Sequence, residues 1–139
     1  MAGPVLIDIE KRPLVQFGTA RRDDVPNFLG IMSIIHQEPN SSAFGRLLAK
    51  RLEPADELPL AHLFEEISTL AVHGLLVEDV LFDAFAFDYY WDELKGRIHQ
   101  VRSESGNEKF CENFEIAAEL AAEYRAQRPP KVHPRQAGA

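Results

Sequence analysis

The segment from residue 108 to 124 separates its apolar and acidic residues at the spacing of an α-helix. At 100° per residue, five apolar side chains lie within about 40° of one line along such a helix. They are Phe110, Phe114, Ala117, Ala121 and Tyr124. The opposite line carries Glu108, Glu112, Glu115, Glu119 and Glu123. A helix divided in this way must bury its apolar side against other elements, and the sequence Arg128-Pro129-Pro130 ends it.

Four earlier segments also repeat their apolar residues at the helical period rather than at the strand period of two. Helices are predicted over about residues 24–38, 40–53, 56–73 and 78–104. The side chains expected on the buried side of the first are Phe28, Leu29, Met32 and Ile35. We predict an all-α fold, a small bundle of about five helices with an extended or short hairpin N-terminal arm and a flexible C-terminal tail.

The first residues of the chain differ from the helical body. Residues 5–9 and 14–17 are rich in β-branched and aromatic residues, with Pro13 between them, which favours a short hairpin or an extended arm. A two-stranded unit is marginal on its own, so the arm must lie either on the helical body or on another chain. The predicted division is an N-terminal arm over residues 1–22, a helical domain over 23–127 and a disordered tail over 128–139.

Cysteine usage, hydropathy and charge indicate where the protein is expected to be located and which partners it is expected to bind. The 139 residues include one cysteine, which cannot form an internal disulfide, so a reducing, cytoplasmic location is predicted. The longest apolar stretches are far shorter than the roughly 20 residues of a membrane span, and no signal peptide is visible, so no membrane contact is expected. A net charge of −7 disfavours direct binding to nucleic acid and favours basic partners.

Patterns that carry catalysis or bind cofactors are missing from the sequence. Ser/His/Asp, Walker and dinucleotide-binding patterns are absent. His62 stands before Glu65 and Glu66 at a spacing that metal sites use, but the Glu-x-x-His unit of di-iron bundles does not occur. Cys111 is interpreted as a partly buried structural cysteine, because neighbouring glutamates raise the pKa of a thiol. We therefore predict a non-enzymatic protein with no catalytic residues, no cofactor and no metal.

Six aromatic residues fall within ten positions of the longest predicted helix. They are Phe82, Phe85, Phe87, Tyr89, Tyr90 and Trp91. Consecutive positions on a helix are 100° apart, so one face cannot carry all of them. One interpretation places Phe82, Phe85 and Tyr89 in the core. The other makes Phe87, Tyr90 or Trp91 an exposed anchor for a partner, since aromatic residues are enriched at interfaces.

The acidic side of the last predicted helix has two interpretations as well. Glu112, Glu115 and Glu119 would ordinarily form a solvated face. In the sharper hypothesis they imitate a phosphate backbone and occupy a basic groove on a nucleic-acid-handling protein, as small inhibitors encoded by mobile elements or phages do.

Three short patterns are spread over about residues 60–125. They are Phe64-Glu65-Glu66-Ile67 leading to Gly74-Leu75, then Trp91 with Leu94 and Arg102, then Asn113-Phe114-Glu115. Together they resemble a bacterial domain-of-unknown-function family of small helical proteins. The resemblance implies an all-α fold in which these helices pack together, and it implies no activity. Val77 stands where family members often have an aspartate, and many members carry an N-terminal membrane segment that we do not expect here.

These observations lead to two hypotheses for the function. The leading hypothesis is a helical protein-protein interaction domain that binds another protein, or a second copy of itself, through the aromatic segment or the N-terminal arm. The alternative is an acidic inhibitor or nucleic-acid mimic that uses the glutamates of the last predicted helix.

Overall fold

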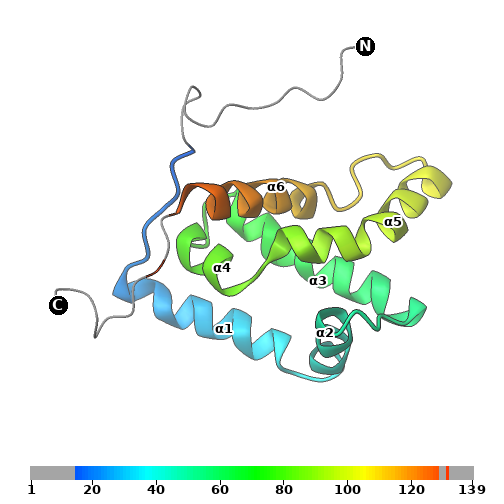
Figure 1. Cartoon of the computed structure of the whole chain (residues 1–139), viewed down its shortest axis with the longest axis horizontal. Coiled ribbons are helices and arrows are strands. Elements are labelled where there is room, and N and C mark those ends of the chain that lie inside the picture. The colour runs from blue at the N-terminus through cyan, green and yellow to red at the C-terminus, as the bar shows by residue number, and fades with distance from the viewer. Residues whose placement is uncertain (1–14, 129–130, 132–139) are drawn as a thin grey trace, which may run out of the picture.

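The computed structural model describes residues 15–128 and residue 131. Within these residues the chain forms six α-helices, one short 3-10 turn and no strand (Figure 1). In chain order the elements are η1 (Arg22–Asp24), α1 (Val25–Ile35), α2 (Asn40–Leu48), α3 (Pro54–Val72), α4 (Glu78–Ala84), α5 (Phe87–Ser105) and α6 (Glu112–Gln127). The predicted all-α class is confirmed. The strand-like run at residues 5–9, and the tail after residue 131, lie outside the described residues.

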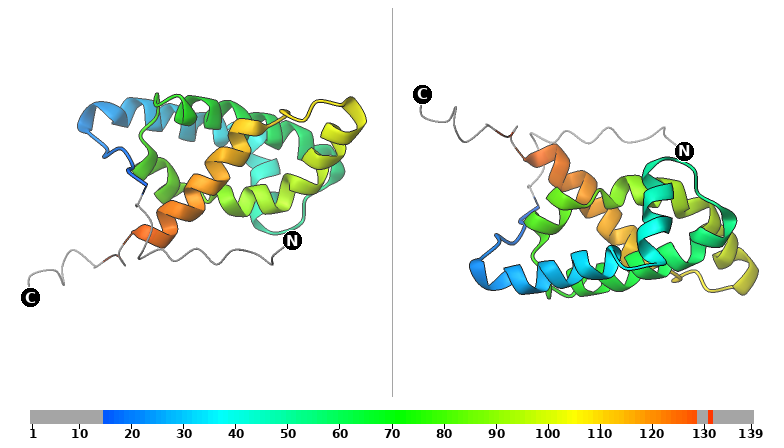
Figure 2. Two further views of the ribbon diagram at one scale, coloured as in Figure 1. Left: turned by 90° about the horizontal axis from the view of Figure 1, so that it is seen from above. Right: turned by 90° about the horizontal axis from the view of Figure 1, so that it is seen from below.

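The centre of the core lies where α6 crosses α3 and α5 (Figure 2). Each of these helices contributes one fully buried phenylalanine, namely Phe64, Phe87 and Phe114. Their ring centroids are 5.4 to 6.3 Å apart, within the range of favourable aromatic pairs. The predicted division is confirmed within α6, where Phe114 is buried while Glu112 and Glu119 are exposed. The placement of Glu108 and Phe110 in the same helix is wrong, because Cys111 takes a left-handed conformation, with φ 59°, and α6 begins after it.

The ends of α3 follow from the chemistry of their residues. The backbone N–H of Glu53 donates to Asp56 Oδ2 at 3.1 Å, and Pro54 occupies the first helical position, where a missing N–H costs nothing. At the other end Gly74 has a φ of 75°, the left-handed conformation that glycine adopts without strain. The predicted end at Gly74 is confirmed, and the helix begins two residues before the predicted start at Asp56.

The single helix predicted over residues 78–104 is wrong, because the chain leaves the helical conformation between α4 and α5. Phe85 is extended, with φ −127° and ψ 123°, and Ala86 is also non-helical. In one continuous helix Phe85 and Phe87 would point 200° apart. The break turns both side chains inward, and their rings stack with centroids 6.4 Å apart. Burial of a second large aromatic side chain thus favours two helices over one.

Residues 15–21 form an extended strap that lies on the same chain. Val15 exchanges two hydrogen bonds with the Gln127 side chain at the end of α6, at 2.8 and 3.0 Å. The Phe17 ring meets the edge of Tyr124 at 5.5 Å, and the N–H of Ala20 donates to Asp79 Oδ2 of α4 at 3.0 Å. Of the two placements left open for the arm, this part of it packs on the helical body.

Helices α1 and α2 are both shorter than predicted. α1 ends at Ile35, and α2 ends at Leu48 because Lys50 takes a left-handed conformation, with φ 56°, and lets the N–H of Arg51 reach the carbonyl of Arg46 at 2.8 Å. Arg46 then pairs with Asp56 of α3 through two hydrogen bonds of 2.6 and 2.7 Å. This pair holds α2 against the first turn of α3.

Helix α1 lies along one edge of the molecule, and its main helix neighbour is α2 (Figure 1). Only Ile31 and Ile35 of its residues are fully inside the core, while Phe28 and Met32 are half-buried. The placement of Leu29 on the buried side is wrong, since 55% of it is exposed. Leu29 stands one position from Phe28 and is therefore turned about 100° away from it, toward solvent.

Candidate functional site

Residues from the three sequence patterns meet at one junction of α3, α5 and α6. Glu65 Oε1 accepts a hydrogen bond from the backbone N–H of Phe114 at 2.8 Å, and Asn113 Nδ2 donates to Thr69 Oγ1 at 3.2 Å. Glu65 thus satisfies one of the first N–H groups of α6, which have no partner within the helix. Its carboxylate is also favoured there by the positive end of the helix dipole.

Arg102 of α5 completes this junction from the other side. Its Nε donates to the carbonyl oxygen of Phe110 at 2.8 Å, its Nη2 lies 3.0 Å from Glu115 Oε1, and its guanidinium group stands 5.7 Å from the centre of the Trp91 ring. Arg102 thus contacts the turn before α6, the first turn of α6 and Trp91 through a hydrogen bond, an ion pair and a ring contact within the same chain. The contacts of Glu65 and Arg102 at this junction hold α3, α5 and α6 together.

The structure separates the three acidic candidates on α6. The carboxylate of Glu115 is engaged by Arg102 and is half-buried. Glu112 and Glu119 are exposed, and neither has an ion pair within the part of the chain that is described. Two of the three glutamates are thus available to a partner.

Of the three aromatic residues proposed as exposed anchors, Phe87 and Tyr90 are buried, which makes this interpretation wrong for both of them. Trp91 is half-buried, with its ring edge-on to Phe114 at 5.2 Å. Tyr89, which was expected in the core, is 61% exposed and lies under the Arg125 guanidinium group at 5.0 Å. The break at Phe85 shifts the phase of the second helix, which exchanges the inward and outward positions.

The candidate metal ligand and nucleophile take structural positions. His62 is exposed with its ring 5.6 Å from that of Phe110, and Glu65 is occupied at α6, so the two do not form a pair. No three metal-ligating side chains gather anywhere in the described ranges. Burial raises the pKa of the Cys111 thiol to about 12, with the charge of Glu65 as a second cause. The expected direction is correct, but burial outweighs the neighbouring acids as the reason.

The exposed side of α1 is apolar and carries no charge. None of the eleven residues of α1 is ionisable. Val25, Leu29 and Ile34 are 50%, 55% and 44% exposed, and Gly30 and Ser33 lie between them on the outer side. Leu75, in the connection from α3 to α4, is 66% exposed and lies near the N-terminal half of α1. We call this set of six residues the α1 face.

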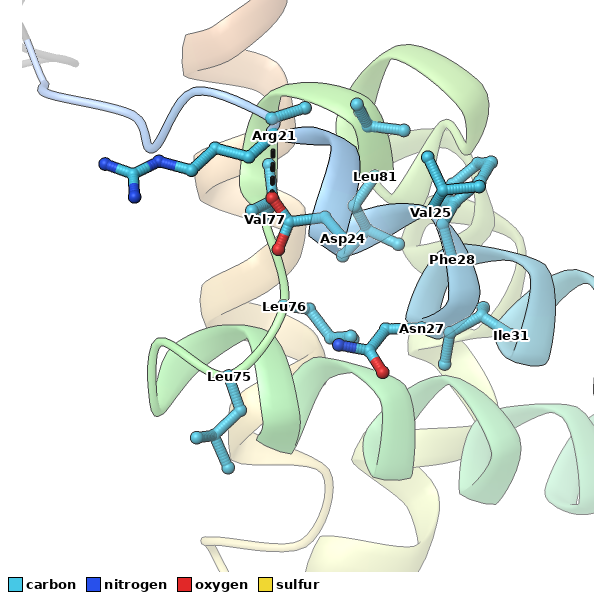
Figure 3. Close-up of a pocket in the computed structure, with 12 residues that line it drawn as sticks. Arg21, Asp24, Val25, Asn27, Phe28, Ile31, Leu75, Leu76, Val77 and Leu81 are labelled. Atoms are coloured by element: carbon cyan, nitrogen blue, oxygen red, sulfur yellow. Dashed lines mark hydrogen bonds between the residues drawn. The ribbon is translucent and has the colours of Figure 1, made fainter.

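A small apolar cavity opens beside the N-terminal half of α1 (Figure 3). It has a volume of about 80 Å³, and Phe28, Ile31 and Leu76 contribute to its walls. Sites for cofactors and drug-sized ligands are several times larger, at roughly 300 to 1,000 Å³. The cavity has the size to receive one aliphatic side chain. An exposed apolar surface with a cavity of this size at its edge is suited to contact another protein.

A second hollow, between α2 and the start of α5, differs in composition. Leu48 and Tyr89 are both exposed there, but Lys50, Asp92 and Glu93 stand among them. Apolar side chains interspersed with charges are ordinary on protein surfaces. The absence of charge therefore distinguishes the α1 face from this hollow.

Sequence reasoning missed the α1 face and named other residues as candidates for partner binding. The signal was present, because an amphipathic surface helix normally carries charged residues on its outer side and residues 25–35 carry none. Helical periodicity alone did not separate Leu29 from the truly inward positions Phe28 and Ile31.

Comparison with known proteins identifies one family. The family model described as domain of unknown function DUF4760 matches residues 23–120. The match begins just before α1, so it includes the two helices that precede the resemblance seen over residues 60–125. No curated protein and no solved structure matches the chain. Across the described residues, every helix falls short of the length or hydropathy that a membrane-spanning helix needs.

Proposed function

Because the chain belongs to the DUF4760 family of domains of unknown function, its role is inferred from its own surfaces, and we propose a non-enzymatic protein-protein interaction domain. The partner docks on the α1 face. The observation that carries the proposal is the exposure of Val25, Leu29 and Ile34 on a helix that has no ionisable residue. Burying such side chains against a partner gains about 25 cal/mol per Å² of apolar surface.

The groups that an enzyme of this size would use support a non-enzymatic role. The thiol of Cys111 is buried with a pKa of about 12, so almost none of it is ionised near neutral pH. The junction formed by Glu65 and Arg102 is occupied by contacts within the chain. The cavity beside α1 has no room for a substrate together with a cofactor. The hollow between α2 and α5 is larger, at about 470 Å³, but it is an open surface with the charges of Lys50, Asp92 and Glu93 dispersed around it.

Affinity capture with a pair of matched variants tests this proposal. Leu29 and Leu48 are exposed to a similar extent, 55% and 60%, but lie on α1 and α2 respectively. Tagged wild type and the variants Leu29→Lys and Leu48→Lys are incubated with host lysate and washed at high salt, and each recovered protein is quantified. A stoichiometric partner should remain on wild type and Leu48→Lys and be lost from Leu29→Lys. Equal recovery on Leu29→Lys and wild type would rule out docking at the α1 face.

An acidic inhibitor of a nucleic-acid-handling protein is the second candidate function. Its support is the exposure of Glu112 and Glu119, which have no ion pair among the described residues. A partner held this way should dissociate as salt shortens the Debye length from about 10 Å at 0.1 M to about 3 Å at 1 M. It should also be lost from Glu112→Gln/Glu119→Gln and retained by Leu29→Lys, which is the reverse of the result expected for the α1 face.

A further inference from the structure

We propose that the partner on the α1 face is the α1 face of a second copy of this chain, packed antiparallel about a two-fold axis. This inference rests on the proposed function and names the occupant of the same surface. In a two-fold interface the same patch must be complementary to itself. The charge, the helix ends and the shape of the α1 face each meet that requirement.

The distribution of charge favours contact between copies at α1. Two copies with a net charge of −7 each repel one another over most of their surfaces. Over Val25–Ile35 there is no ionisable group, so this helix can meet its copy without opposing like charges. A basic partner would instead be attracted to acidic surfaces such as that of α6, where Glu112 and Glu119 are exposed.

The residues that flank α1 determine the direction of pairing. Arg21 and Arg22 precede the helix with both side chains exposed, and the Arg21 side chain extends away from the cavity (Figure 3). Asp23 is exposed beside them, and the N–H of Arg21 donates to Asp24 Oδ2 at 2.7 Å. Glu38 follows the helix and is also exposed. Residues 21–24 carry two arginines and two aspartates and are neutral overall, so Glu38, which accepts a hydrogen bond from Ser42 Oγ at 2.7 Å, decides the direction. Antiparallel copies place each Glu38 near Arg21 and Arg22 of the other copy, whereas parallel copies would bring the two Glu38 carboxylates together.

The shape of the α1 face supports the same arrangement. The cavity opens at the N-terminal half of α1, and Ile34 projects from the C-terminal half. Antiparallel pairing centred on Gly30 places Ile34 of each copy opposite the cavity end of the other. At Gly30 a Cβ atom would meet nothing within 4 Å, so the backbone there is open to close approach by a second helix.

Sedimentation velocity of the full chain, from below micromolar to several hundred micromolar, tests the pairing with matched variants. Wild type should form dimers as its concentration rises. Gly30→Arg should stay folded by circular dichroism and raise the dimer dissociation constant at least about tenfold, because it buries a charge at the centre of the contact. Gly96→Arg, at an equally open glycine on α5, should dimerise like wild type. Wild type that stays monomeric, or Gly30→Arg that dimerises normally, would overturn the inference.

A charge swap tests the antiparallel direction. Arg22→Glu alone and Glu38→Arg alone should each weaken dimerisation, and the double variant should restore it. A double variant as weak as the singles would overturn the antiparallel pairing.

If wild type is monomeric while a different protein is captured through Leu29, the second copy is excluded as the partner and the proposed function stands. If neither association occurs, both are excluded.

Discussion

Phe64 on α3 and Leu29 on α1 are both large apolar side chains, but Phe64 is fully buried and 55% of Leu29 is exposed. Around Phe64 the rings of Tyr90, Phe114 and Phe87 stand 4.9 to 5.7 Å away, and polar groups such as Glu65 have partners within the chain. Among residues 15–128, nothing equivalent covers the helix around Leu29. The difference teaches that the buried aromatic contacts are concentrated where α3, α5 and α6 meet, and that the outer side of α1 takes little part in them.

Truncation of Phe64 and of Leu29 should give the largest difference in the free energy of unfolding. Phe64→Ala is expected to lower the free energy of unfolding by about 3–5 kcal/mol, because it removes buried surface and leaves a cavity. Leu29→Ala should change it by less than about 0.5 kcal/mol. Urea unfolding at low micromolar protein provides the measurement. A large loss in Leu29→Ala under these conditions would mean that α1 is packed within the single chain.

Glu65 and its neighbour Glu66 sharpen the comparison on the core side. Glu65→Ala should cost about 1–2 kcal/mol, since the N–H of Phe114 loses its acceptor at the start of α6. Glu66 is exposed, and Glu66→Ala should have almost no effect. Thermal unfolding of both variants compares them directly. Similar melting temperatures would contradict a capping role for Glu65.

The pair of Arg46 with Asp56 is expected to give a pH-dependent effect. The hydrogen bond from Arg46 lowers the pKa of Asp56 below its usual range. A carboxyl group with a lowered folded pKa stabilises the fold above its unfolded pKa of about 3.9, and that stability is lost as the pH falls through the folded value. Asp56→Asn should therefore be less stable than wild type at pH 7. The difference in the free energy of unfolding between Asp56→Asn and wild type should disappear as the pH is lowered in acid-unfolding curves. A difference that persists below pH 2 would contradict a stabilising role for the ionised Asp56.

The smallest expected change in stability concerns two helical glycines with free space around them. Gly30 on α1 and Gly96 on α5 are both exposed in helices, and a Cβ at either meets nothing within 4 Å. Each change to alanine should stabilise the monomer by up to about 1 kcal/mol through helix propensity. Chemical unfolding of Gly30→Ala and Gly96→Ala at low concentration measures this. A loss of stability in Gly30→Ala alone would show that the outer side of α1 is already in contact within the chain.

Much of the helical fold could be predicted because single helices leave local signals. The apolar side of α6 and the glycine end of α3 at Gly74 were correct for that reason. The break between α4 and α5 could not be found in this way, because residues 78–104 keep helical spacing throughout. What favours the break is the burial of Phe85 against Phe87, which depends on the surrounding helices.

The candidate site was harder to predict than the fold. Tyr89 and Tyr90 are adjacent in sequence, and only the phase of α5 makes Tyr90 buried and Tyr89 exposed. That phase is set by where α5 begins. Leu29 was misplaced for a related reason, since it stands at the margin between the inner and outer sides of α1. For a residue in such a position, an apolar side chain does not by itself indicate whether it is buried or faces solvent.

The two hydrogen bonds between Val15 and Gln127 have a consequence for how the protein is made. They join residues 112 positions apart, at the two ends of the described chain. On the ribosome α1 emerges first, and at about 5–20 residues per second α6 follows on the order of ten seconds later. Until then the strap before α1 has no Gln127 to hold it. The hydrogen bond of Ala20 to Asp79 can form earlier in synthesis, whereas the contact of Val15 can form only after α6 has been translated.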